Sequence, residues 1–367
     1  MFLVERIIGL GIFVSVLCFV CLLISVEKYN YKKVLFVYIL ALAIMAFYHV
    51  PDETADIYRI YNWMGSDFKY LNFAGILERY SDSSTFLATL YYWLFSKTGE
   101  FRLLPATTVA IVYSCIFYII AKTADIYDIK RKYIVISLIF IMSTDSFMSA
   151  ASGIRSMLAC SLVGFCFFRE CVEKKFRLFH ILLYLIAALV HNFAVIIIII
   201  RLLIPLFNKN KRLLKKMLYL GIVIIFGIGI SQNASGLIED VFNKADSYIN
   251  DGKYVYLWGY VTAALIAFII FISMIRKNNK VSVNLKELSQ IKIITLVFLT
   301  IAISLCTVFS IFTRLNTHIA PIVYLPYLMI SLNNNAGTKR NGYVVFLCFM
   351  TFMIVCARGY LCSLKFF

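Results

Sequence analysis

The sequence predicts an all-α polytopic membrane protein with about twelve (11–13) transmembrane helices, and three observations support this fold class. Hydrophobic residues make up 62% of the 367 residues and charged residues only 15%, whereas about a quarter of a soluble domain is charged. The apolar residues form runs of about 20, the helix length that crosses the hydrocarbon core of a bilayer. Backbone groups in lipid must bond within their own segment, so these runs are predicted to be helices. The alternating segments of a membrane barrel are absent from the sequence.

Basic residues assign a side to each loop between the predicted spans. Lysine and arginine gather after every odd-numbered span, and most acidic residues lie in the complementary loops. Because basic loops stay on the cytoplasmic side, this alternation predicts both termini outside. The predicted spans are 7–26, 34–50, 103–121, 133–149, 153–168, 178–190, 192–207, 217–231, 256–275, 291–311, 316–332 and 343–357.

Two segments decide the number of spans. Residues 84–96 are apolar but short, so we expect a re-entrant or interfacial helix on the outer side, with a thirteenth span as the alternative. Residues 178–207 would overshoot the bilayer as one helix, and His191 and Asn192 interrupt them. We therefore predict two short spans that meet at this polar pair.

No soluble domain is predicted. Residues 1–367 form a single integral membrane domain, whose longest outer loops are about 51–83 and 232–255. Charge is expensive near the bilayer centre, and the predicted mid-membrane zone is almost free of it. Arg201, near the inner end of its span, is expected to snorkel inward. The charged and titratable residues predicted to gather at the outer mouth are Asp52, Glu53, Asp56, Arg59, Asp145, Arg155, His191 and Arg314.

Two arginines are candidate ligands for a phosphate group. Arg155 follows Gly153 and Ile154 and opens a helix, where backbone N–H groups already favour anions. Its guanidinium fork suits phosphate; the alternative is an arginine that reaches to lipid headgroups. Arg314 is expected on an outer turn between two spans, where the alternative is a solvated turn residue.

His191 and the segment Asp52–Tyr61 are candidate sites for proton transfer and sugar binding. His191 stands in an apolar stretch where leucine would cost nothing, so we expect a base or a donor to a phosphate oxygen. The carboxylates can accept a sugar hydroxyl proton, and tyrosines offer flat faces to sugar rings; a solvated loop with interfacial aromatics is the alternative. The remaining candidates are Asp52, Glu53, Asp56, Tyr58, Arg59, Tyr61 and Asn192.

Several classes of protein are disfavoured. The motifs HExxH, GxSxG, Walker A, GxGxxG and DxD are absent from the sequence, which argues against zinc proteases, serine hydrolases, ATPases and metal-dependent sugar-nucleotide transferases. We therefore expect no metal site and no cofactor. The net charge of +17 lies in short loops, as the positive-inside rule predicts, so no nucleic-acid partner is expected.

Three stretches taken together resemble the EpsG-type exopolysaccharide polymerases, within the Wzy-like bacterial polysaccharide polymerase family. The first is the outer segment from Asp56 to Tyr61, and the second is Ser152–Arg155 at the start of a helix. The third is 187–194, with the sequence AALVHNFA around His191. Members commonly carry glutamine after the arginine and serine near the histidine, and this chain departs from both patterns.

The resemblance implies a GT-C-like glycosyltransferase at the outer face of the bacterial inner membrane. It would polymerise undecaprenyl-pyrophosphate-linked oligosaccharide units into O-antigen, capsule or exopolysaccharide, without a metal. Arg155 and His191 match family-typical polar positions, Asp56 falls on the outer acidic position, and Arg314 matches loosely. The arginines would stabilise the leaving pyrophosphate, and His191 or Asp56 would deprotonate the acceptor hydroxyl. The implied partners are the lipid-linked oligosaccharide, the bilayer, and as candidates a chain-length regulator and a flippase.

Two other classes stay open. A lipid-linked oligosaccharide flippase or other transporter usually has a polar site near the midplane and repeat symmetry, and the sequence shows neither. The second class comprises another polyprenyl-phosphate-dependent glycosyltransferase, with its base at Asp52 or Glu53, or a membrane acyltransferase.

Overall fold

The structure is a computed structural model that describes residues 2–53, 55–144, 146–174, 177–203, 257–274, 288–306, 309–334, 337–357 and 364–366. The predicted span 217–231, the outer loop 232–255 and Asp145 lie outside these residues. The described residues form helices and no β-strand, apart from one isolated bridge between His49 and Phe366. The helical class predicted from the sequence is confirmed for this part of the chain.

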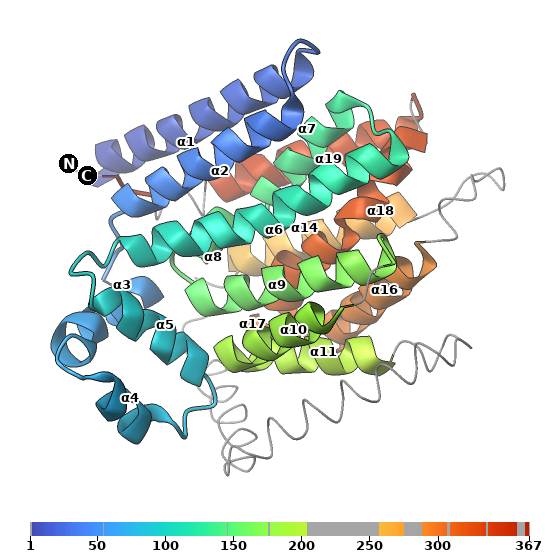
Figure 1. The fold of residues 1–367 in the computed structure, drawn as a ribbon. Helices are drawn as coiled ribbons and strands as arrows, with labels where there is room; N and C mark the ends of the chain where they lie inside the picture. The colour runs from blue at the N-terminus through green and yellow to red at the C-terminus, as the bar shows by residue number, and fades with distance from the viewer. Residues whose placement is uncertain are drawn as a thin grey trace.

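Figure 1 shows the order of the described helices along the chain. Two of them, η1 and η3, are π-helical. The bounds are α1 Phe2–Ser25, α2 Tyr31–Tyr48, α3 Asp56–Trp63, η1 Met64–Phe68, α4 Phe73–Tyr80, α5 Phe86–Ser96, α6 Leu103–Tyr127, α7 Arg131–Met142, α8 Ser146–Ala151, α9 Ile154–Cys171, α10 Leu178–Val190, α11 Asn192–Leu203, α14 Leu257–Met274, α16 Ser289–Ser304, α17 Phe309–Thr313, η3 Arg314–Ile319, α18 Ala320–Asn334 and α19 Lys339–Val355.

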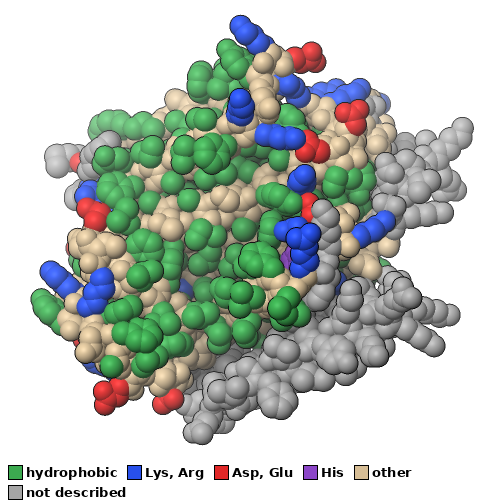
Figure 2. Space-filling view, viewed as in Figure 1, with side chains coloured by type: hydrophobic (Ala, Val, Ile, Leu, Met, Phe, Trp, Pro, Cys, Tyr) green, Lys and Arg blue, Asp and Glu red, His purple; other side chains and the backbone are tan. Residues whose placement is uncertain are grey.

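The described part contains five helical stretches that are long and apolar enough to cross a membrane. Apolar side chains cover much of the face in Figure 2, and α1 and α2 leave Phe19, Leu22 and Phe36 more than 60% exposed. Outward-facing apolar residues of this size suit a lipid environment. The chain is therefore a membrane-embedded helical protein. The five stretches are Val4–Ser25, Tyr31–Tyr48, Leu103–Tyr127, Leu257–Met274 and Ile311–Asn334.

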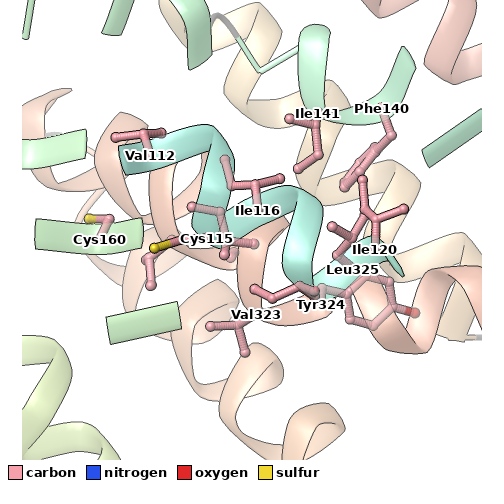
Figure 3. Packing of buried hydrophobic residues seen from close by; sticks show 14 of the residues in the cluster. Val112, Cys115, Ile116, Ile120, Phe140, Ile141, Cys160, Val323, Tyr324 and Leu325 are labelled. Carbon is pink, nitrogen blue, oxygen red and sulfur yellow. The ribbon is translucent and has the colours of Figure 1, made fainter. Parts of the chain in front are cut away.

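The core lies where α6, α7, α9 and α18 meet. In Figure 3, Ile116 and Ile120 of α6 lie among side chains from α7 and α18. A Cβ atom at Gly164 would come within 2.5 Å of the Ile322 side chain, so glycine allows α9 and α18 to approach closely. The stretch from Ile311 to Asn334 is the most enclosed of the five, and every residue of its segment Ala320–Leu332 is buried.

Ion pairs and hydrogen bonds define two ends of the bundle. At one end, Glu5 pairs with Lys365 at 2.9 Å and Arg6 pairs with Asp52 at 3.0 Å. We call this the α5 end, because α3, α4 and α5 also lie there (Figure 1). At the opposite end, the Arg131 guanidinium donates to backbone carbonyls of the α1–α2 loop. Loops that the sequence assigns to different sides therefore lie at different ends of the bundle.

Two predicted short segments are confirmed as short helices. Within the predicted segment 84–96, residues Phe86–Ser96 form α5, which has 11 residues. Residues 178–203 form α10 and α11, which are separated by His191 in an extended conformation and lie side by side (Figure 1). The polar pair therefore interrupts the helix where the sequence indicated.

Two other predictions are wrong. Span 133–149 is interrupted, because α7 ends at Met142 and α8 begins at Ser146. The hydroxyls of Ser143 and Thr144 donate to carbonyls three residues back, a local bond that competes with helix continuation. In addition, α16 ends at Ser304 and the next helix has already begun at 309, so Arg314 lies inside a helical stretch and not on a turn.

Candidate functional site

Arg155 lies in the first turn of α9, at the α5 end of the bundle. Gly153 precedes the helix, and a Cβ atom there would lie 3.1 Å from the Ser149 carbonyl oxygen, so glycine allows the tight connection from α8. The Ser156 hydroxyl donates to the Gly153 carbonyl at 3.0 Å. The Arg155 side chain is partly exposed, and no described residue forms a hydrogen bond or ion pair with its guanidinium. A first turn without an acidic residue, and an arginine that pairs with no described residue, together favour an anion.

In a second, smaller apolar cluster, α3 and α5 pack against the start of α9. It includes Ile57 of α3, Tyr92 of α5 and Ile154 of α9, and it is separate from the main core. Ile57 is next to Asp56, and Ile154 is next to Arg155. The cluster thus brings an acidic residue and a basic residue, far apart in sequence, to the same part of the α5 end.

Tyr92 is a buried residue of this region that sequence analysis did not single out. Its pKa is raised mainly by burial; the positive charge of Arg155 lowers it, and the carboxylate of Asp56 raises it further. Its hydroxyl oxygen has no hydrogen-bond partner among the described residues. Nothing in the sequence marked this residue, because tyrosines are common in apolar segments at an interface.

The acidic candidates of the first outer loop already have basic partners. Asp52 accepts two hydrogen bonds from Arg6 of α1, at 3.0 and 3.1 Å. Asp56 pairs with Arg59 one helical turn later, and both side chains are more than half exposed. Asp52 therefore ties α1 to the loop, whereas Asp56 keeps a solvent-facing carboxylate.

The other candidates of this loop are dispersed. Glu53 is exposed and Tyr58 is partly exposed. The Tyr61 ring lies 6.1 Å from the Phe101 ring, beside the start of α6. The structure therefore does not gather all of these side chains around Arg155.

Arg314 occupies the first position of η3, which packs against α9. Its charge acts on Cys160, six residues into α9, which is about 9 Å along the helix axis from Ile154. The Arg314 side chain is partly exposed, and no described residue forms an ion pair or a hydrogen bond with it. Arg155 thus lies in the first turn of α9, and Arg314 lies on η3, the helix that packs against α9.

Asn316, also in η3, is a second polar residue that sequence analysis did not single out. It is fully buried, and neither side-chain amide atom has a hydrogen-bond partner among the described residues. Segments of π-helix occur often at functional sites. Its neighbour Thr317 contacts His318 Nδ1 at 2.8 Å.

His191 and Asn192 lie between α10 and α11, close to the loop before α5. The Asn192 side-chain amide donates to the Ser84 hydroxyl at 2.9 Å. The Phe193 backbone N–H donates to His191 Nδ1 at 3.0 Å. A neutral imidazole whose Nδ1 accepts carries its proton on Nε2. In this arrangement the donor of the His191 ring is its Nε2–H.

Arg201 does not snorkel toward the inner surface, as the sequence led us to expect. It is 2% exposed, pairs with Glu170 of α9 at 2.7 Å, and lies over the Phe167 ring at 5.0 Å. The prediction is wrong because a carboxylate 31 residues earlier neutralises the charge inside the bundle.

Comparison with protein families identifies a match. The family model described as the EpsG family matches residues 58–365. This range contains Arg155, His191 and Arg314, and it begins two residues after Asp56. No curated protein matches the chain, and no solved structure matches it.

Proposed function

Because the chain belongs to the EpsG family, we propose that it is a polysaccharide polymerase that joins lipid-linked oligosaccharide repeat units. The donor is a glycan on undecaprenyl pyrophosphate, and the acceptor is a hydroxyl of a second unit. The bond between the donor sugar and the pyrophosphate oxygen breaks, and a bond to the acceptor oxygen forms. Undecaprenyl pyrophosphate leaves, and the acceptor proton passes to a base.

The observation that carries this proposal is that Arg155 of α9 and Arg314 of η3, which packs against α9, form no ion pair or hydrogen bond with a described residue. Other described arginines pair with carboxylates or backbone carbonyls, among them Arg6, Arg59, Arg79, Arg102, Arg131, Arg169 and Arg201. Arg155 and Arg314 have no such partner among the described residues. Partly covered guanidinium groups without counter-ions suit a multiply charged ligand such as pyrophosphate. They would offset the charge that develops as the pyrophosphate leaves, without a metal or a cofactor.

The proton and hydrogen-bond roles divide between His191 and Asp56. His191 Nδ1 accepts a backbone N–H, so its Nε2–H donates to a phosphate or sugar oxygen. Asp56 has a solvent-facing carboxylate near Arg155, and it acts as the base for the acceptor hydroxyl. Tyr58, Tyr61 and the remaining loop candidates would contact sugar at the rim.

The same proposal includes a topology. We infer twelve spans in one integral membrane domain over residues 1–367, GT-C-like in architecture, in the inner membrane of a bacterium. The α5 end then faces away from the cytoplasm, where lipid-linked units with their headgroups at the bilayer surface can reach Arg155. Proposed partners are the lipid-linked oligosaccharide, the bilayer, a flippase and a chain-length regulator. The product is O-antigen, capsule or exopolysaccharide.

Deletion of the gene, followed by resolution of surface polysaccharide on a gel, tests the function. The proposal predicts single repeat units in place of long chains. A flippase would leave no units, and a membrane acyltransferase would leave full-length chains with altered decoration; either result contradicts the proposal.

Complementation connects the result to the site. Wild-type protein should restore long chains, whereas Arg155→Ala should not. Arg79→Ala is the matched control, because Arg79 lies at the same end but pairs with Asp67 at 3.4 Å on the surface. It should restore long chains as the wild type does.

A further inference from the structure

The Tyr92 hydroxyl is a polar group with an unexplained position. The residue is 3% exposed, and the hydroxyl oxygen has no hydrogen-bond partner among the described residues. A covered hydroxyl without a partner is unfavourable, because it has lost its bonds to water. A phenylalanine would fill the same space without that cost. No contact among the described residues therefore explains why this position carries a tyrosine and not a phenylalanine.

The neighbouring residue, Tyr91, shows that a tyrosine hydroxyl on α5 can form a hydrogen bond within the protein. The hydroxyl of Tyr91 lies 3.1 Å from that of Thr108 on α6, so one donates to the other. Tyr91 and Tyr92 thus share a helix and a residue type, and Tyr91 is partly buried. They differ in that the Tyr92 hydroxyl has no hydrogen-bond partner among the described residues.

The surroundings of Tyr92 indicate what a partner would be. Tyr92 belongs to the same buried cluster as Ile57 and Ile154, the immediate neighbours of Asp56 and Arg155. The charges of both residues act on its phenol. Burial raises the pKa of the phenol, so the group stays protonated at neutral pH and serves as a neutral donor. A neutral donor beside an unpaired guanidinium suits an anionic oxygen.

We propose that Tyr92 is a substrate-binding residue that donates a hydrogen bond to a phosphate oxygen of the lipid-linked pyrophosphate held by Arg155. The inference rests on the proposed function and adds a residue to it. The hydroxyl is covered by protein, so ligand access requires a side-chain movement of the kind common at binding surfaces.

Three tyrosine-to-phenylalanine variants test the proposal, each expressed in the deletion strain. Tyr92→Phe should lower the yield of long chains about tenfold, which corresponds to one hydrogen bond of about 1.4 kcal/mol. Because that hydroxyl bonds to none of the described residues, the unfolding temperature of the purified protein should not fall. Tyr91→Phe should lower the unfolding temperature by about 2 °C and leave chain yield unchanged. Tyr38→Phe removes another fully buried hydroxyl without a partner among the described residues, on α2, and should lower neither the unfolding temperature nor the chain yield.

A binding measurement separates substrate contact from structure. Undecaprenyl pyrophosphate should raise the unfolding temperature of the wild type, Tyr91→Phe and Tyr38→Phe equally, and that of Tyr92→Phe by less. Wild-type chain yield and ligand response in Tyr92→Phe would overturn the proposal and leave the proposed function intact. Long chains in the deletion strain itself would overturn the proposed function, and this inference with it.

Discussion

The two ends of α9 differ in whether their charged side chains form ion pairs. At its C-terminal end, Arg169 pairs with Glu173 at 3.1 Å and Glu170 pairs with Arg201 at 2.7 Å. At its N-terminal end, Arg155 has no such partner among the described residues, although Asp56 lies in the same region. Paired charges hold neighbouring helices together, whereas an unpaired arginine retains its affinity for an anion. One helix thus carries a structural end and an end suited to binding.

The largest loss of stability should come from disrupting the ion pair at the C-terminal end of α9. Glu170→Ala leaves the Arg201 guanidinium buried without its counter-ion, which typically costs about 3–5 kcal/mol. We expect a marked fall in the unfolding temperature of the detergent-purified protein. The double variant Glu170→Met with Arg201→Met removes both charges and should recover most of the loss. A single variant as stable as the wild type would show that the pair is not structural.

At the opposite end of α9, Arg155→Ala should leave stability within about 0.5 kcal/mol of the wild type, because no hydrogen bond or ion pair with a described residue is lost. Polymer formation should fall about 100-fold or more, as when a donor to a developing charge is removed. Chain yield on a gel, normalised to protein in the membrane, measures this effect. If Arg155→Ala unfolds the protein as Glu170→Ala does, the two ends do not differ.

Arg314→Ala should lower polymer formation by about tenfold, or ~1.4 kcal/mol, because Arg155 would still bind the leaving pyrophosphate. Arg314→Lys keeps the charge but loses the guanidinium fork, so its yield should lie between those of wild type and alanine. Dose-response curves with limiting expression would resolve these steps. Equal yields in all three proteins would remove Arg314 from the site.

The smallest effect should come from Tyr118→Phe. The Tyr118 hydroxyl donates to Glu173 at 2.6 Å, and its removal should cost about 1 kcal/mol of stability. Polymer yield per folded molecule should stay at the wild-type level, since the bond lies at the structural end. Reduced yield without reduced stability would contradict this assignment.

The sequence predicted the features that depend on the polarity of residues close to one another in the chain. His191 and Asn192 interrupt an apolar run, and the helix breaks there. The length of the apolar run at 84–96 predicted the short helix α5. The distribution of basic residues among the loops indicated which loops lie at opposite ends of the bundle. Each of these signals lies within a few residues of the feature that it predicts.

The features missed depend on contacts between distant segments. Arg201 pairs with a carboxylate 31 residues away, which its own apolar surroundings do not indicate. The π-helical turn at Arg314 continues a helix through a polar stretch that resembles a loop in sequence. Tyr92 becomes a candidate binding residue because it packs in the same cluster as Ile57 and Ile154, the sequence neighbours of Asp56 and Arg155.

The most direct test is the affinity of purified protein for undecaprenyl pyrophosphate. Wild type and the Glu170→Met/Arg201→Met variant should bind it equally well, and Arg155→Ala should bind at least about tenfold more weakly. Equal affinity in Arg155→Ala and wild type would contradict the claim that the N-terminal end of α9 holds the pyrophosphate.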